Sequence, residues 1–186
     1  MMSGVRNYLE KDKENLRRIC VETSSFPTGS ETQRNFLYYL YNDYYSECEG
    51  ENCFVFTDEN DEAVGYILCA EDFDRFYGEM KKTYLPRLLN LGRRYYMTSL
   101  GEIFVHRIFR KEYPAHLHID ILPSYQGMGA GTQLVGALKA HLKGKNCRGI
   151  MLSAGSSNKK AIFFYKKNGF RVKAKFFGST VMVYDF

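Results

Sequence analysis

The sequence has no long apolar run, no C-x-x-C pair and no block of like charge. No stretch approaches the roughly 20 apolar residues that a membrane-spanning helix needs, and residues 1–20 have no apolar run of the signal-peptide type. The cysteines are odd in number and scattered, which indicates neither a disulfide framework nor a zinc site. We therefore expect a cytoplasmic protein with no membrane partner and no metal. Its reduced thiols would be Cys20, Cys48, Cys53, Cys69 and Cys147.

Length and composition favour one globular domain. The chain has 186 residues, of which 45% are hydrophobic, and this suits a single compact domain over residues 1–186. The formal net charge of +5 is modest, and the basic residues are interspersed with acidic ones. Nucleic acid is therefore a poor candidate for a partner. The positive excess either solvates the surface or attracts an anionic ligand, and both interpretations stay open.

The stretch from Ala115 to Leu142 carries the strongest pattern. His116 to Leu122 alternates polar and apolar residues, which predicts a strand, and Pro123 ends its hydrogen-bonding run. A glycine-rich turn follows, and after it the apolar residues recur at helical spacing. The glycines are Gly127, Gly129 and Gly131, and the apolar residues are Leu134, Val135, Leu138 and Leu142. The chain is thus predicted to run from strand to glycine loop to helix.

A helix that begins in such a loop is suited to hold a phosphate or pyrophosphate. Its first N–H groups are unpaired, and its N-terminus carries a partial positive charge. Glycines also let the backbone turn tightly and approach a ligand closely. Their spacing here fits neither the Walker sequence nor the dinucleotide-binding G-x-G-x-x-G. Lys139, Lys143, Lys159 and Lys160 would add attraction for phosphates if they lie near the loop.

Residues 114–170 contain two sequence motifs, one after the other, that together are specific to one family. The first is Gln126-x-x-Gly129-x-Gly131, directly after the strand that ends at Pro123. The second is Asn158-x-x-Ala161-x-x-x-Tyr165-x-x-x-Gly169-Phe170. Over residues 114–170 the chain resembles the GNAT superfamily of acyl-CoA-dependent N-acyltransferases. Residues 19–72 also look similar to the acetyltransferase-like domains attached to O-GlcNAc hydrolases.

The resemblance implies a fold and a substrate site. The fold is α/β (α+β), a mixed and mostly antiparallel central sheet with helices on both faces and two strands splayed apart at the site. Acetyl-CoA is implied as the acyl donor, with its pyrophosphate on the glycine loop and its pantetheine arm paired with the central strand. A free N–H at Ile121 or Leu122 would polarise the thioester carbonyl. The implied binding residues are Ile121, Leu122, Gln126, Gly127, Met128, Gly129, Ala130, Gly131, Thr132, Asn158 and Tyr165.

The implied reaction is direct transfer of an acetyl group to a primary amine in a ternary complex. Tyr165 matches the tyrosine of the family that faces the CoA sulfur and can donate a proton to it; as a plain helix residue it would be a core aromatic. A base must also take a proton from the amine. His116, His118 and Asp120 share one face of the predicted strand, which either is a structural His-Asp hydrogen-bond network or lines the acceptor cleft. We favour His118 and Asp120 as the catalytic pair, with Glu102 as the outside alternative.

The remaining elements follow from periodicity and from breaks. Helices are predicted over Asp12–Glu22, Glu31–Ser46, Asp72–Lys82, Tyr84–Leu91 and Lys159–Asn168, and strands over Cys53–Thr57, Ala63–Cys69, Gly149–Ala154, Phe170–Phe177 and Ser179–Tyr184. Residues 72–92 form a helical insertion relative to the smallest members of the family. Residues 93–110 give no pattern that singles out a site. The tyrosine-rich stretch from Tyr38 to Tyr45 packs in the core or touches substrate.

Three classes of function remain open. The first is an acetyl-CoA-dependent N-acetyltransferase acting on a small amine or on a protein amine. The second is a non-catalytic acyl-CoA-binding sensor, and the third is a partner-binding module that works through the aromatic residues 36–45. The acceptor amine and the length of the acyl group cannot be read from the sequence, and a homodimer is the default expectation.

Overall fold

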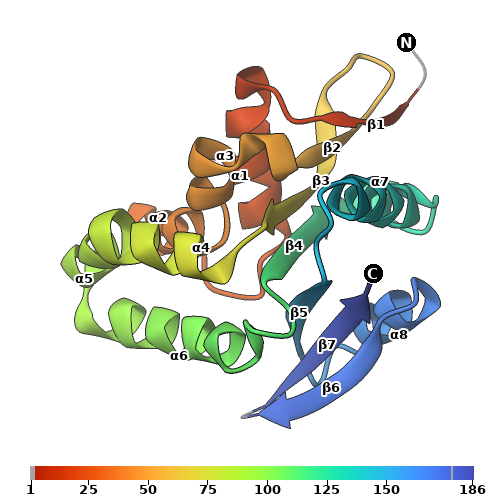
Figure 1. Ribbon diagram of the computed structural model, residues 1–186. Coiled ribbons are helices and arrows are strands. Elements are labelled where there is room, and N and C mark those ends of the chain that lie inside the picture. Colours follow the sequence, from red (N-terminus) through yellow and green to blue (C-terminus); the bar gives the residue numbers. More distant parts are fainter. Residues whose placement is uncertain (1–2, 177) are drawn as a thin grey trace.

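The computed structural model describes residues 3–176 and 178–186 of the chain. Its centre is a seven-stranded sheet in the order β1-β2-β3-β4-β5-β7-β6 (Figure 1). Neighbouring strands are antiparallel except for β4 and β5, which are parallel. The prediction of a mixed, mostly antiparallel sheet is therefore confirmed. The strands are β1 Gly4–Asn7, β2 Phe54–Thr57, β3 Ala63–Ala70, β4 Ala115–Ile121, β5 Gly149–Gly155, β6 Arg171–Phe176 and β7 Ser179–Asp185.

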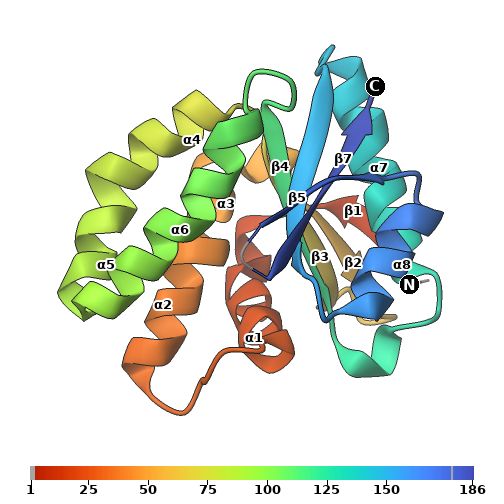
Figure 2. The same cartoon turned by 90° about the horizontal axis from the view of Figure 1, so that it is seen from below.

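Helices cover both faces of the sheet. On one side lie α1 Lys13–Thr23, α2 Glu31–Tyr41, α3 Asp43–Cys48, α4 Phe73–Glu79, α5 Leu85–Leu91 and α6 Arg93–Phe109 (Figures 1 and 2). The other side carries α7 Ala130–Gly144, which contacts β1 to β4, and α8 Lys159–Lys167 beside the β6–β7 hairpin. Shorter turns are η1 Glu10–Asp12, η2 Gly50–Asn52, the π-helical η3 Met80–Tyr84, and η4 Pro123–Tyr125. No helix in the described part of the chain is long and apolar enough to cross a membrane.

The region from Ala115 to Leu142 folds as predicted, from a strand through a glycine loop to a helix. Leu134, Val135, Leu138 and Leu142 are all buried on the face of α7 that packs against the sheet. β3 is buried at every position, because helices cover both of its faces. Pro123 follows the end of β4, as expected, and begins η4.

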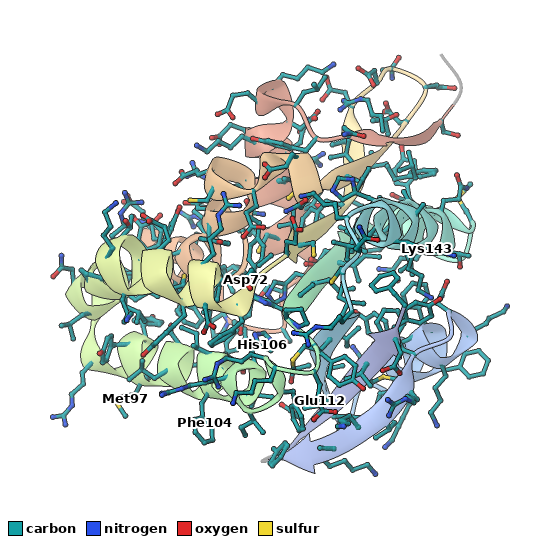
Figure 3. All side chains as sticks on the ribbon, in the orientation of Figure 1. Asp72, Met97, Phe104, His106, Glu112 and Lys143 are labelled. Atoms are coloured by element: carbon teal, nitrogen blue, oxygen red, sulfur yellow. The ribbon has the colours of Figure 1, made fainter. Side chains whose placement is uncertain are left out.

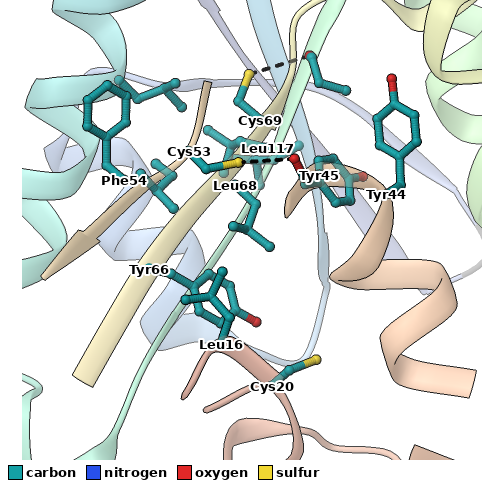
Figure 4. Packing of buried hydrophobic residues seen from close by; sticks show 14 of the residues in the cluster. Leu16, Cys20, Tyr44, Tyr45, Cys53, Phe54, Tyr66, Leu68, Cys69 and Leu117 are labelled. Carbon is teal, nitrogen blue, oxygen red and sulfur yellow. Dashed lines mark hydrogen bonds between the residues drawn. The ribbon is translucent and has the colours of Figure 1, made fainter. Parts of the chain in front are cut away.

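The core is rich in tyrosine. Tyr44, Tyr45 and Tyr66 are each at most 1% exposed, and Figure 4 shows them among Leu68 and Leu117. Tyr44 and Tyr45 come from α3, so the tyrosine-rich stretch packs in the core at its C-terminal end. The Sγ atom of Cys53 lies 3.6 Å from the carbonyl oxygen of Tyr45, and all five cysteines are free thiols.

Four local features differ from the sequence prediction. β1 and α6 were not predicted. The helix predicted over Glu31–Ser46 is two helices, because Asn42 leaves helical geometry at φ −133° and ψ −63°. The two helices predicted over 72–91 are joined without a gap by the π-helical η3. Phe177, the predicted end of a strand, lies outside the described residues.

β4 and β5 separate soon after they meet. Within the described residues their pairing consists of Ala115 with Ile150 and His116 with Met151, although each strand has seven residues. β4 is held along its other edge by β3, and β5 by β7. The later halves of β4 and β5 thus face each other across a gap with unpaired backbone groups. This is the splay that the family resemblance implied.

Candidate active site

The glycine loop connects the open end of β4 to α7. Gly127 and Gly129 have φ of +78° and +86°, a region that favours glycine, and a Cβ atom on either would meet nothing within 4 Å. The main-chain N–H groups from Gly127 to Thr132 donate no hydrogen bond within the described residues. The loop therefore presents a run of free donors at the positive end of a 15-residue helix, which is an arrangement suited to an anion.

Gly131 has a different role from the other two glycines. A Cβ atom there would lie 2.9 Å from Cε2 of Phe164 and 3.2 Å from Cδ1 of Ile121. Its φ is not positive, so it is required for space and not for backbone conformation. Gly131 thus lets α7 pack closely against α8 and the end of β4. The prediction that all three glycines serve the turn holds for Gly127 and Gly129 only.

The backbone N–H groups of β4 point alternately toward β3 and toward the gap. The Leu122 N–H donates to the carbonyl oxygen of Val64, at 3.0 Å, on the β3 side. Because these groups alternate along an antiparallel edge, the N–H groups of Ile119 and Ile121 point away from β3 and toward the gap. Of the two residues predicted to offer a free N–H, Leu122 is therefore paired with β3 and Ile121 is not, and Ile119 presents a second N–H to the gap. Nε2 of Gln126 donates to the Ile121 carbonyl oxygen at 2.8 Å and closes the end of the strand.

Tyr165 stands on α8 with its phenol buried but unpaired. Asn158 begins this helix as predicted, and its Oδ1 accepts the Ala161 N–H at 3.0 Å. Tyr165 is 8% exposed, and its hydroxyl makes no hydrogen bond within residues 3–176 and 178–186. Burial, and after it the negative charge of Asp120, raises the pKa of Tyr165 well above that of free tyrosine. The phenol thus remains protonated over the neutral range and is free to donate.

The two histidines of β4 share one tyrosine. The hydroxyl of Tyr45 lies 3.0 Å from Nε2 of His116 and 2.9 Å from Nε2 of His118. A hydroxyl donates one hydrogen, so one histidine accepts it and the other donates to the oxygen. His116 Nδ1 is buried without a partner, and a buried N–H without an acceptor is costly. We therefore assign the donating Nε2–H to His116, while His118 accepts at Nε2 and carries its hydrogen on Nδ1.

Asp120 lies on the same face of β4 with different partners. The hydroxyl of Tyr66 donates to its Oδ2 at 2.6 Å, whereas the hydroxyl of Thr23 donates to the carbonyl oxygen of Ile19 at 2.8 Å. Burial raises the pKa of Asp120 to about 6, against the opposing effect of the Tyr66 hydrogen bond. By contrast, burial lowers the pKa of His118 to about 3. The structure shows no hydrogen bond between His118 and Asp120 in the part of the chain that it describes.

A narrow pocket opens beside His118. It is lined by Leu40 and Tyr41 of α2, Tyr45 of α3, Phe76 of α4, Glu102, Ile103 and His106 of α6, and His118 of β4. Figure 3 shows His106 on the side of α6 that faces the sheet, with Met97 and Phe104 on the opposite side. The carboxylate of Glu102 makes no ion pair or hydrogen bond with any described residue, and burial raises its pKa. The pocket thus combines aromatic walls with one unpaired carboxylate.

Comparison with known proteins decides the family. The model of the acetyltransferase (GNAT) family matches residues 16–170. The chain belongs to this family. Among solved structures it is similar to SsHAT, with 26% identity and a TM-score of 0.88 over 100% of this chain and 98% of that one. It also has the fold of the PaiA N-acetyltransferase of Thermoplasma acidophilum, which was solved with coenzyme A. The two chains are 14% identical and match with a TM-score of 0.63 over 100% of each. A third similar structure is phosphinothricin acetyltransferase (Pat) of Sinorhizobium meliloti, solved with AcCoA, with 14% identity and a TM-score of 0.63 over 100% of this chain and 89% of that one.

In this GNAT chain the predicted site residues fall into two groups on the two faces of the sheet. Gly127 to Thr132 and Tyr165 lie on the side of α7 and α8, while His118 and Asp120 lie on the side of α1 and α3. The negative charge of Asp120 nevertheless contributes to the raised pKa of Tyr165. Of the four lysines considered for phosphates, Lys139 donates to the Asn168 carbonyl oxygen and Lys159 to that of Ser156, at 2.9 Å.

The sequence did not reveal the partners of the polar strand face. Tyr45 was one of several tyrosines in a row, and Tyr66 lies in an apolar run with no polar pattern around it. Tyr66 becomes a partner through the register of β3 against β4, which places it opposite Asp120. Period-two placement of polar residues on β4 was the one signal that such partners must exist.

Proposed function

We propose that this protein is an N-acetyltransferase that transfers the acetyl group of acetyl-CoA to a primary amine by direct attack in a ternary complex. The observation that carries the proposal is the gap between β4 and β5, which leads into a loop of unpaired N–H groups at the start of α7. A pantetheine arm needs an extended slot beside a strand edge, and a pyrophosphate needs convergent donors. The acetyl-CoA bound to the Pat structure is consistent with that ligand.

The donor site would be built from backbone more than from side chains. The N–H groups from Gly127 through Met128, Gly129 and Ala130 to Thr132 would hold the pyrophosphate. Ile119 and Ile121 would pair with the pantetheine arm, and the Ile121 N–H would polarise the thioester carbonyl. Gln126 and Asn158 support the site by fixing the end of β4 and the start of α8.

Tyr165 would act as the general acid. The amine enters as an ammonium ion and loses one proton to a base, after which its nitrogen attacks the thioester carbon. The C–N bond forms, the C–S bond breaks, and the departing sulfur takes the proton of Tyr165. The proton that the nitrogen loses as the amide forms restores the phenol. An unpaired hydroxyl with a raised pKa fits this role, because it stays protonated until the thiolate develops.

We assign the base to Asp120 rather than to His118. A carboxyl with a pKa of about 6 is ionised at neutral pH and takes up a proton more readily than an ordinary aspartate. The His118 imidazole, with a pKa of about 3, is a weak proton acceptor, and its Nε2 is occupied by Tyr45. His118 would instead orient the acceptor through its Nδ1–H.

Thiol release from acetyl-CoA in the presence of primary amines tests the function. We expect release above the rate without amine for at least one amine, and a product whose mass is increased by one acetyl group. Binding of acetyl-CoA without amine-dependent release would favour the alternative of a non-catalytic acyl-CoA sensor. Absence of binding would favour a partner-binding module.

A further inference from the structure

Arg94 and Glu102 of α6 are unpaired side chains of opposite charge. They are eight residues apart, which at 1.5 Å and 100° per residue separates them by about 12 Å along the helix and about 80° around it. Neither side chain forms an ion pair with any described residue, and each lines a pocket. Thr98 stands between them, one helical turn from each.

The carboxylate of Glu102 lies in a small pocket, called here the inner pocket. The cavity around Glu102 has a volume of about 10 Å³, about the space of one water-sized group. Aromatic rings of Tyr41, Tyr45 and Phe76 form its walls. Burial lowers the pKa of His106 to about 4 and that of His118 to about 3, so both histidines are neutral near pH 7. An ammonium head has the right size and charge, and aromatic faces attract it as well.

Arg94 lines a larger, outer pocket, which lies about one helical turn further along α2 and α6. This pocket has a volume of about 80 Å³ and is lined by Phe26 and Pro27, by Gln33 and Phe36 of α2, and by Arg94, Tyr95 and Thr98 of α6. Phe36 is one helical turn from Leu40 of the inner pocket, and Thr98 is one turn from Glu102. The two pockets therefore lie one after the other along α2 and α6, with Arg94 at the outer one.

We infer that the acceptor is an unbranched amine with an anionic group at its far end, which enters between α2 and α6 with its ammonium at Glu102 and its anion at Arg94. The inference rests on the proposed function and names the substrate class for it. A second ammonium at the far end would meet Arg94 and be repelled, so the outer pocket disfavours diamines and polyamines. His118 forms part of the inner wall, which puts the amine on the face of β4 that carries Asp120.

Three acceptors of equal chain length test the inference. They are 6-aminohexanoate, hexylamine and 1,6-diaminohexane, whose far ends are anionic, neutral and cationic. We expect kcat/KM for acetyl transfer to fall in that order. Glu102→Gln should raise the KM for 6-aminohexanoate and for hexylamine about tenfold, as for loss of a hydrogen bond to a charged group. Arg94→Gln should raise the KM for 6-aminohexanoate alone. The expected increase is only about two- to fivefold, because Arg94 is exposed and its ion pair with the substrate would be screened by water.

Matched controls are Glu14→Gln and Arg93→Gln, which remove the same charges outside both pockets and should leave the three KM values unchanged. A preference for 1,6-diaminohexane would overturn the inference, as would a Glu102→Gln enzyme with unaltered KM values. Acetylation of other amines with none of these three accepted would also overturn it. Failure of the proposed function looks different, because no amine would then cause thiol release, whether or not acetyl-CoA binds.

Discussion

The hydroxyl of Tyr66 lies 2.6 Å from Oδ2 of Asp120, across the pair formed by β3 and β4. Tyr66 is fully buried, so this bond holds the carboxylate in a fixed position at the end of the strand, near the gap. Burial raises the pKa of Asp120, and the hydrogen bond partly opposes that rise by favouring the ionised form. Burial therefore dominates the pKa of Asp120, and the Tyr66 hydrogen bond limits the rise.

The pH dependence of acetyl transfer should report this carboxyl. With a pKa of about 6, Asp120 is protonated below that pH and cannot act as a base, so kcat/KM should fall on the acid side with a midpoint near 6. Tyr66→Phe removes a bond that favours the ionised form and should move the midpoint upward by about one unit. Tyr39→Phe, at a half-buried tyrosine outside the site, is the control. Identical acid limbs for Tyr66→Phe and the native enzyme would contradict the assignment of the base.

Replacing Tyr165 with phenylalanine should separate catalysis from binding. The ring keeps its contacts with Phe164 and Phe170, at centroid distances of 5.2 and 5.7 Å, while the acid is lost. We expect kcat to fall about 10²- to 10⁴-fold, as for loss of a general acid, with little change in the dissociation constant for CoA. Steady-state kinetics with calorimetric titration of CoA measure the two quantities. Full turnover by Tyr165→Phe would show that another group protonates the sulfur.

Two glycines of α7 should respond in opposite ways to alanine. At Gly131 a Cβ atom would press on Phe164 at 2.9 Å, and overpacking of this kind costs about 1–3 kcal/mol. At Gly136 a Cβ atom meets nothing within 4 Å, so Gly136→Ala should stabilise the protein by about 0.5–1 kcal/mol through helix propensity. Urea unfolding of the two variants measures the difference. Equal stabilities would mean that α7 and α8 do not pack as closely as described.

Acid should destabilise the fold through its buried histidines. Burial lowers the pKa of His106 from 6.5 to about 4, so the folded protein keeps it neutral while the unfolded chain binds a proton. The stability it contributes is fully present above pH 6.5 and is lost as the pH falls toward 4, by about 3 kcal/mol. His106→Phe should flatten the fall in unfolding free energy between these values. A native and a variant protein with the same pH dependence would refute the burial of a neutral His106.

The sequence predicted those elements whose signals lie in one continuous stretch of chain. The strand, glycine loop and helix of residues 115–144 carry alternation, glycines and helical spacing in one continuous stretch. Asn158 and Gly169, which has φ +83°, mark the two ends of α8 by capping chemistry. Each of these signals depends on neighbours in the chain, so no knowledge of tertiary contacts was needed.

The elements that sequence did not predict depend on contacts between distant residues. β1 is four residues long and mostly polar, and it exists because it pairs with β2. α6 has no single apolar face, because Ser99, Ile103 and His106 are buried while Met97 and Phe104 are more than half exposed. The break at Asn42 lets α3 turn Tyr45 toward the β4 histidines. The pocket beside Glu102 is lined by four helices and a strand, so local sequence could not predict it.

Thermal melting with and without acetyl-CoA tests the central claim most directly, namely that the gap and the glycine loop form an acyl-CoA site. A ligand bound by the folded state alone must raise the midpoint. We predict a rise with acetyl-CoA and with CoA but not with adenosine, and no rise for Gly129→Val, which places a β-branched residue at φ +86° on the loop. An unchanged midpoint at millimolar acetyl-CoA would contradict the account.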